Sequence, residues 1–164
     1  AGKSTFLRAL SLSIVMANMG LPVCARSYRY RPIKLITSMR TADSLAEESS
    51  YFYAEIKRLE FIVQKIEDKT YFIVLDEILK GTNSKDKEEG SRKFLKKLVN
   101  SGSSGLIATH DLSLCEVEKE HPQIYNMHFD VEIRGNDLEF DYLLKPGICT
   151  NMNASFLLKK MNLI

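Results

Sequence analysis

Two acidic side chains follow directly on an apolar run, and their position suits metal-assisted hydrolysis. Residues 71–75 are all apolar or aromatic, and Asp76 and Glu77 come next. Such a run predicts a strand buried on both faces of a parallel sheet. Ligands of open α/β sheets bind at the carboxyl ends of the strands. One carboxylate there can hold a divalent cation while the next activates a water molecule. The alternative is a strand that ends in a solvated acidic turn.

The first five residues, Ala-Gly-Lys-Ser-Thr, match the second half of the phosphate-binding loop G-x-x-x-x-G-K-[ST]. Gly2 allows the backbone to approach phosphate oxygens, because it has no Cβ. Lys3 can contact the β- and γ-phosphates, and the Ser4 hydroxyl can bind Mg²⁺. Thr5 completes the motif, and the start of the helix that follows presents free N–H groups that favour an anion. Combined with the Asp76 strand, the motif predicts a nucleoside triphosphate site.

The sequence begins inside this motif and without Met. We therefore expect a fragment that lacks the preceding strand and the first glycine of the loop. We expect such a fragment to bind nucleotide poorly by itself.

Composition indicates one globular domain, residues 1–164, with 45% hydrophobic residues. The 23 basic and 21 acidic residues nearly balance, so overall charge does not predict a nucleic-acid surface. The three cysteines form no C-x-x-C pair, which disfavours a zinc site and favours a reducing compartment. No apolar run is long enough to span a membrane, and no signal peptide is visible. We expect a cytoplasmic protein.

Hydrophobic periodicity and turn residues predict alternating helices and strands. We expect helices over 6–19, 43–67 and about 87–99, and a closing helix over 151–163. Residues 23–39 favour two short strands or an extended ribbon. Residues 105–110 predict a second buried strand that ends at His110. Residues 124–145 predict a β-hairpin that turns at 135–137.

Taken in order, these motifs resemble the ATPase domain of the MutS family of DNA mismatch-repair proteins, over essentially the whole chain. The match includes the family's phosphate loop, signature segment, Walker B strand, switch histidine and terminal stretch. The residues that carry it are Ala1-Gly2-Lys3-Ser4-Thr5, Asp43-Ser44-Leu45, Ser50-Tyr51-Phe52 with Glu55, Leu75-Asp76-Glu77-Ile78 with Gly81, Thr82 and Asp86, Ala108-Thr109-His110, and 144–163 with Pro146-Gly147.

The resemblance implies an α/β fold of the P-loop NTPase class. It is an ABC-type ATPase core with a mainly parallel sheet flanked by helices and a C-terminal β-hairpin. It implies ATP and Mg²⁺ as ligands and a homodimer formed through the ATPase domain, in which Ser50 of one subunit completes the nucleotide site of the other. It also implies that ATP turnover is coupled to mismatched or branched DNA, bound by domains absent from this chain. The implied catalytic residues are Glu77 and His110, the nucleotide-binding residues are Gly2, Lys3, Ser4, Thr5, Ser50 and Asp86, and the metal ligands are Ser4 and Asp76.

Two positions depart from the family pattern: Glu48 stands where Gly is frequent, and Tyr51 where Thr is usual. The chain therefore looks like a divergent MutS-related branch. One alternative function is the ABC-class ATPase head of a transporter or chromosome-maintenance protein. No Leu-Ser-Gly-Gly-type signature is present to support it. The other alternative is a non-catalytic nucleotide switch, which would not need Glu77.

Overall fold

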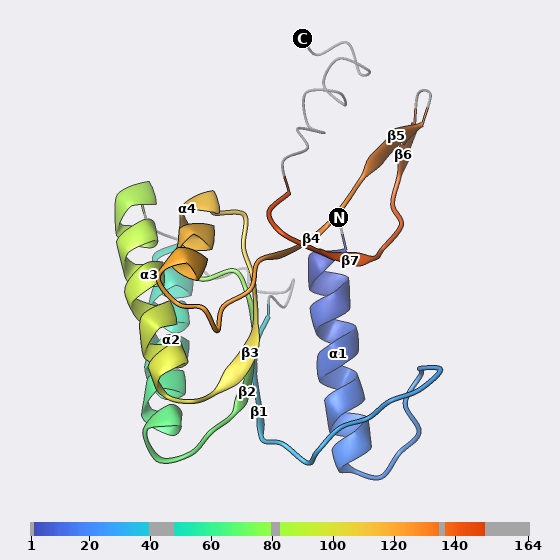
Figure 1. The fold of residues 1–164 in the computed structure, drawn as a ribbon. Coiled ribbons are helices and arrows are strands. Elements are labelled where there is room, and N and C mark those ends of the chain that lie inside the picture. Colours follow the sequence, from blue (N-terminus) through green and yellow to red (C-terminus); the bar gives the residue numbers. More distant parts are fainter. Residues whose placement is uncertain (1, 40–47, 80–82, 135–136, 150–164) are drawn as a thin grey trace. The chain divides into compact units, whose positions relative to one another are not determined.

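The computed structural model describes residues 2–39, 48–79, 83–134 and 137–149, and for residues 48–51, 132–134 and 137–138 it describes the backbone alone. The chain divides into two compact units. One unit runs from Ser4 to Leu114 and contains the long helices and the parallel sheet (Figure 1). The other combines Ala1–Lys3 with Cys115–Ile164 and contains the short antiparallel strands.

A three-stranded parallel sheet forms the centre of the larger unit. Its strands are β1 (Leu35–Ser38), β2 (Phe72–Asp76) and β3 (Ser104–Ala108), in the order β1-β2-β3. The middle residues of β2 are buried, as the apolar run predicts. Because β2 is central, it pairs with a strand on each side, and its last residue, Asp76, lies opposite Ala108. The predicted parallel sheet is thus confirmed.

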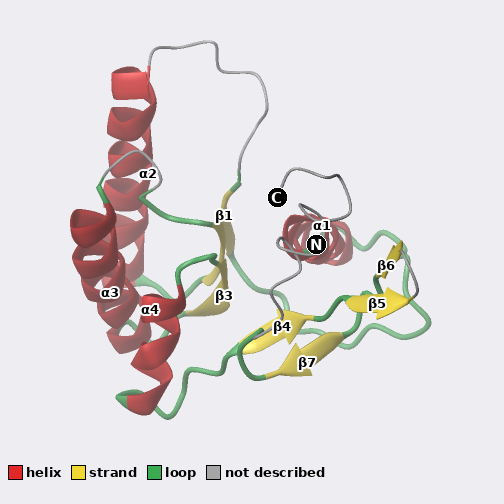
Figure 2. Ribbon diagram, turned by 90° about the horizontal axis from the view of Figure 1, so that it is seen from above, coloured by secondary structure: helices red, strands yellow, loops and turns green. Residues whose placement is uncertain are grey.

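Helices cover both faces of this sheet. The helix α1 (Lys3–Asn18) packs on one face, where Leu7 contacts a cluster that contains Val74 and Ala108. The helices α2 (Glu48–Asp68) and α3 (Ser84–Asn100) pack on the opposite face, where Leu75 lies (Figure 2). Val74 and Leu75 are both 0% exposed, because successive strand residues point to opposite faces. Each such side chain contributes about 1.5–3 kcal/mol through burial.

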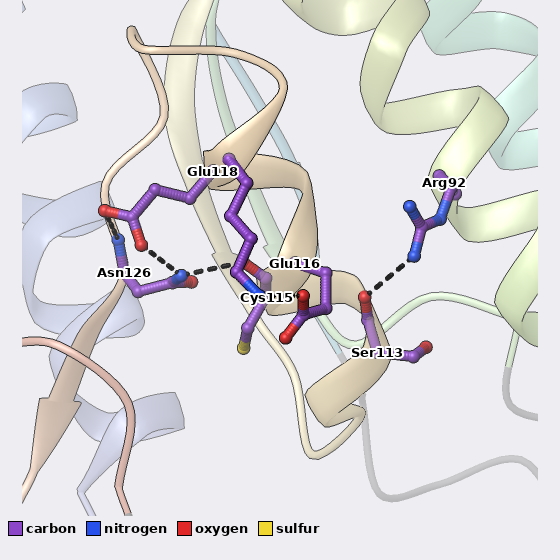
Figure 3. A network of polar contacts seen from close by, with 7 residues as sticks. Arg92, Ser113, Cys115, Glu116, Glu118 and Asn126 are labelled. Atoms are coloured by element: carbon purple, nitrogen blue, oxygen red, sulfur yellow. Dashed lines mark hydrogen bonds and ion pairs between the residues drawn. The ribbon is translucent and has the colours of Figure 1, made fainter.

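The smaller unit is built from two antiparallel strand pairs. They are β4 (Met127–Phe129) with β7 (Leu144–Pro146), and β5 (Glu132–Arg134) with β6 (Asp137–Glu139). The pair β5–β6 confirms the predicted hairpin. Asn126 fixes the start of β4, because its side-chain amide donates to the Cys115 carbonyl at 2.8 Å and to the Glu118 carboxylate at 2.5 Å (Figure 3).

The ribbon predicted over 23–39 is mostly wrong, because β1 occupies only its last residues. The preceding segment is tied to α1 instead of pairing with another strand. The Tyr30 hydroxyl donates to the Ala17 carbonyl at 2.5 Å, and the Asn18 amide donates to the Ile33 carbonyl at 3.0 Å. One aromatic side chain of this segment, Tyr30, therefore anchors it to α1.

Helix boundaries account for the other differences. The helix α3 begins three residues before the expected start at 87, because Asn83 caps it by accepting from the Asp86 N–H at 3.0 Å. The short helices α4 (Leu112–Cys115) and η1 (Glu116–Lys119) were not predicted, since each spans about one turn. The predicted residues 43–47 of the long helix and the closing helix over 151–163 lie outside the described residues.

Candidate active site

Asp76 and Glu77 lie at the carboxyl edge of the sheet. Asp76 is the last residue of β2 and is partly buried. The Glu77 N–H donates to the Ala108 carbonyl at 2.9 Å, so the pairing between β2 and β3 continues one residue beyond the strand. The Glu77 side chain is 21% exposed. The Glu77 carboxylate therefore keeps access to solvent, while the backbone of Glu77 is held by its hydrogen bond to Ala108.

The backbone at Glu77 is strained. Glu77 has φ of 61° and Leu79 has φ of 54°, and both are non-glycine residues in the left-handed region. Each such residue costs about 1–3 kcal/mol and persists only where its surroundings hold it. Strain of this kind is concentrated at functional sites. Because of its left-handed backbone, Glu77 does not direct its side chain as the alternation of a continuing strand would.

His110 lies next to Glu77 at the same edge. β3 ends at Ala108, two residues before the expected end, and His110 follows in the connecting loop. The His110 Nε2 is 3.4 Å from the Glu77 Oε1, and the histidine side chain is 75% exposed. The structure thus brings together the two residues predicted to be catalytic. The exposed imidazole is open to a ligand at the sheet edge.

Side-chain hydrogen bonds hold the loop that carries His110. Asp111 Oδ1 accepts from both the N–H and the hydroxyl of Ser113, at 2.9 and 2.7 Å, and so caps α4. Thr109 Oγ1 accepts from the Asp111 N–H at 3.0 Å. Arg92 of α3 donates to the Ser113 carbonyl at 3.2 Å (Figure 3). These residues were missed in the sequence, although an Asp directly before an apolar segment is a helix-start signal.

The residues that match the phosphate loop lie at the start of α1. Gly2 has φ of 98°, a conformation that favours glycine, and Lys3 is the first residue of α1. Ser4 follows in the first turn and is partly buried, while Thr5 is exposed. Leu7, about one turn beyond Ser4, packs against Val74 and Ala108 near the carboxyl ends of β2 and β3.

The residues present fit a magnesium ion. Mg²⁺ prefers oxygen ligands and is usually bound by one or two protein groups together with phosphates and water. Ser4 offers a hydroxyl and Asp76 a carboxylate, and both side chains are partly buried within the larger unit. The packing of Leu7 on the Val74 face places their two elements against each other.

Two further predicted site residues lie in first turns of helices. Ser50 is in the first turn of α2, and its side chain lies outside the described part of the structure. Asp86 is in the first turn of α3, where its carboxylate accepts from the Asn83 amide at 2.6 Å. This contact gives Asp86 a capping role. Its contact with nucleotide remains a prediction.

The family model that matches the chain and the relatives that resemble it all belong to one family. The family described as MutS domain V matches residues 1–161. The chain is 33% identical over 148 residues to the DNA mismatch repair protein MSH4 of Arabidopsis thaliana, covering 90% of this chain and 19% of that protein. It is 34% identical over 160 residues to the human MutS protein homolog 4, covering 93% and 17%. It is 31% identical over 150 residues to the DNA mismatch repair protein MutS of Thermotoga maritima, covering 90% and 19%.

The chain spans less than a fifth of the length of these relatives. Across the residues described by the structure, no helix has the length and apolar character needed to cross a membrane.

Proposed function

Since the chain belongs to the MutS family through its match to domain V, we propose that it is the ATP-binding and ATP-hydrolysing domain of a MutS-like DNA mismatch-repair protein. The observation that carries the proposal is the pair formed by Glu77 and His110. Their side chains approach to 3.4 Å at the carboxyl edge of a parallel sheet. Glu77 is held there in a strained conformation that a surface turn does not require.

Each residue has a distinct task in this proposal. Glu77 accepts a proton from the attacking water and orients it toward the γ-phosphate. His110 donates a hydrogen bond to a γ-phosphate oxygen. Lys3 binds the β- and γ-phosphates, and Gly2, Thr5 and the start of α1 supply backbone donors. The sheet belongs to a P-loop NTPase core of the ABC type.

Ser4 and Asp76 hold Mg²⁺ in this proposal. The ion, when bound, neutralises charge on the phosphate oxygens. Ser4 contributes its hydroxyl oxygen and Asp76 its carboxylate, and Asp76 is kept in place by the β2–β3 pairing. Phosphate oxygens and waters would complete the coordination of Mg²⁺.

We further propose that two copies of the domain pair and that domains outside this chain bind mismatched or branched DNA. Two of the relatives carry the name DNA mismatch repair protein, which supports this assignment for the parent protein. The family match favours this function over an ABC-class transporter head. A non-catalytic nucleotide switch is the remaining alternative, and it predicts that the parental protein shows no ATP turnover.

The phosphate and metal ligands are tested by binding. In the full-length protein, Lys3→Ala should weaken ATP binding about ten- to a hundredfold, because a hydrogen bond to a charged group contributes about 1.5–3 kcal/mol. Asp76→Ala should weaken binding by a similar factor only when Mg²⁺ is present. Titration calorimetry with and without Mg²⁺ measures both effects. Lys93→Ala, on the exposed surface of α3, is the matched control. Unchanged affinity in both site variants contradicts the assignment.

The histidine is tested by comparing two nucleotides. His110→Ala should lower ATP turnover about tenfold, because one hydrogen bond to the transferred phosphoryl group is lost. Its affinity for ADP should not change, since ADP lacks that group. Steady-state kinetics and ADP titration give the two values, and His121→Ala is the control. An equal loss of affinity for ADP and for ATP would instead identify His110 as a structural residue.

A further inference from the structure

The loop after β2 is held by a carboxylate from another helix. The Leu79 N–H, two residues beyond Glu77, donates to the Glu55 Oε1 of α2 at 2.7 Å. Glu55 and Leu79 are 24 residues apart along the chain, and the hydrogen bond between them is partly buried. It joins α2 directly to the strained turn that carries the proposed base.

The same turn is packed tightly at its far end. The Leu79 side chain is 7% exposed and belongs to the core formed with α2 and α3. A Cβ at Gly90 of α3 would lie 2.7 Å from Leu79 Cδ1, so α3 approaches the loop closely at this glycine. Ile78, between Glu77 and Leu79, is 3% exposed. Packing thus holds the side chains at 78 and 79, while the Glu55 hydrogen bond holds the backbone.

We propose that Glu55 is a positioning residue for Glu77. Left-handed φ values at Glu77 and Leu79 place the Glu77 carboxylate beside His110. A loop that rotates out of this conformation loses the Glu55 bond and leaves the partly buried Leu79 N–H without that acceptor, which is unfavourable. Glu55 therefore favours the conformation in which the base is aimed at the site. It does not touch the substrate. The inference rests on the proposed role of Glu77 in ATP hydrolysis.

The role predicts a separation between kcat and KM. In the full-length protein, Glu55→Ala should lower kcat about tenfold while KM and ATP affinity stay within twofold, because the phosphate-binding residues are untouched. Glu55→Gln should retain most of the activity, since its side-chain carbonyl can accept the same hydrogen bond. Glu55→Asp keeps the charge but is one methylene shorter, and should fall with Ala. Glu60→Ala, an exposed carboxylate on the same helix, is the control.

A double-mutant cycle distinguishes positioning from general destabilisation. If Glu55 acts through Glu77, then Glu55→Ala should add little to the loss caused by Glu77→Gln. Equal and multiplicative losses in the two backgrounds would overturn the inference, as would a Gln variant as inactive as Ala. If Glu55→Ala does not fold, the Gln and Asp variants provide the same comparison. A parental turnover rate in Glu77→Gln would reject the proposed role of Glu77 itself, and not only that of Glu55.

Discussion

Glu77→Gln in the full-length protein should bind ATP with nearly parental affinity and turn it over about 10²–10⁴-fold more slowly. The amide retains the size and the hydrogen-bonding capacity of the side chain, but it does not accept a proton from water at neutral pH. Glu77 is partly buried and its backbone is fixed through Ala108, so the substitution should leave the turn in place. Calorimetry gives the affinity, and phosphate release gives the rate.

The matched control is Glu89→Gln, which makes the same chemical change on the exposed face of α3. Glu89 pairs with Lys93 at 2.5 Å, and both side chains are more than half exposed. Removing an exposed ion pair changes stability little, so this variant should keep parental turnover. A parental rate in Glu77→Gln would contradict the role of Glu77 as the base, whereas the absence of ATP turnover in the parental protein would support the non-catalytic switch. Loss of ATP binding in that variant would point to a structural role for Glu77.

Mixing two inactive variants should restore ATP hydrolysis, because we propose that each site takes residues from two subunits. Lys3→Ala and Ser50→Ala should each be nearly inactive alone. In a mixed dimer, one site receives both defects, while the other combines an intact Lys3 with an intact Ser50. Random exchange makes about half of the dimers mixed, each with one intact site, so about a quarter of the parental rate should return.

A second mixture provides the control for this experiment. Lys3 and Glu77 are proposed to serve the same site from the same subunit, so mixing Lys3→Ala with Glu77→Gln leaves every site defective and should restore nothing. If the Lys3→Ala and Ser50→Ala mixture also stays inactive although mixed dimers form, Ser50 acts within its own chain. The first turn of α2 then offers an ordinary helix cap, for which serine is favoured.

The central features of the larger unit could be predicted from local pattern. The apolar run before Asp76 can be satisfied only by burial on two faces, and this determined both β2 and the edge where its carboxylates emerge. The neighbouring strand that leads to His110 followed from the same pattern. The strands β2 and β3 are neighbours in the parallel sheet, and the pairing of Asp76 with Ala108 confirms it.

Other features depend on contacts between distant residues and leave weak signals in the sequence. The left-handed backbone at Glu77 and Leu79 has no glycine to indicate it, and it is maintained by long-range contacts with Ala108 and Glu55. The extended segment before β1 has the composition of a strand, yet Tyr30 attaches it to α1. In both cases tertiary contacts override the local preference.

A single-turnover measurement tests the proposed chemistry most directly. When product release limits steady-state turnover, a defect in the chemical step is partly hidden. Full-length protein in excess over γ-labelled ATP, at a concentration far above the dissociation constant for ATP and with Mg²⁺ present, reports bond cleavage without product release. Glu77→Gln should cleave about 10²–10⁴-fold more slowly than the parental protein while Glu89→Gln cleaves at the parental rate. Equal cleavage rates in Glu77→Gln and the parental protein would contradict the assignment of Glu77 as the base.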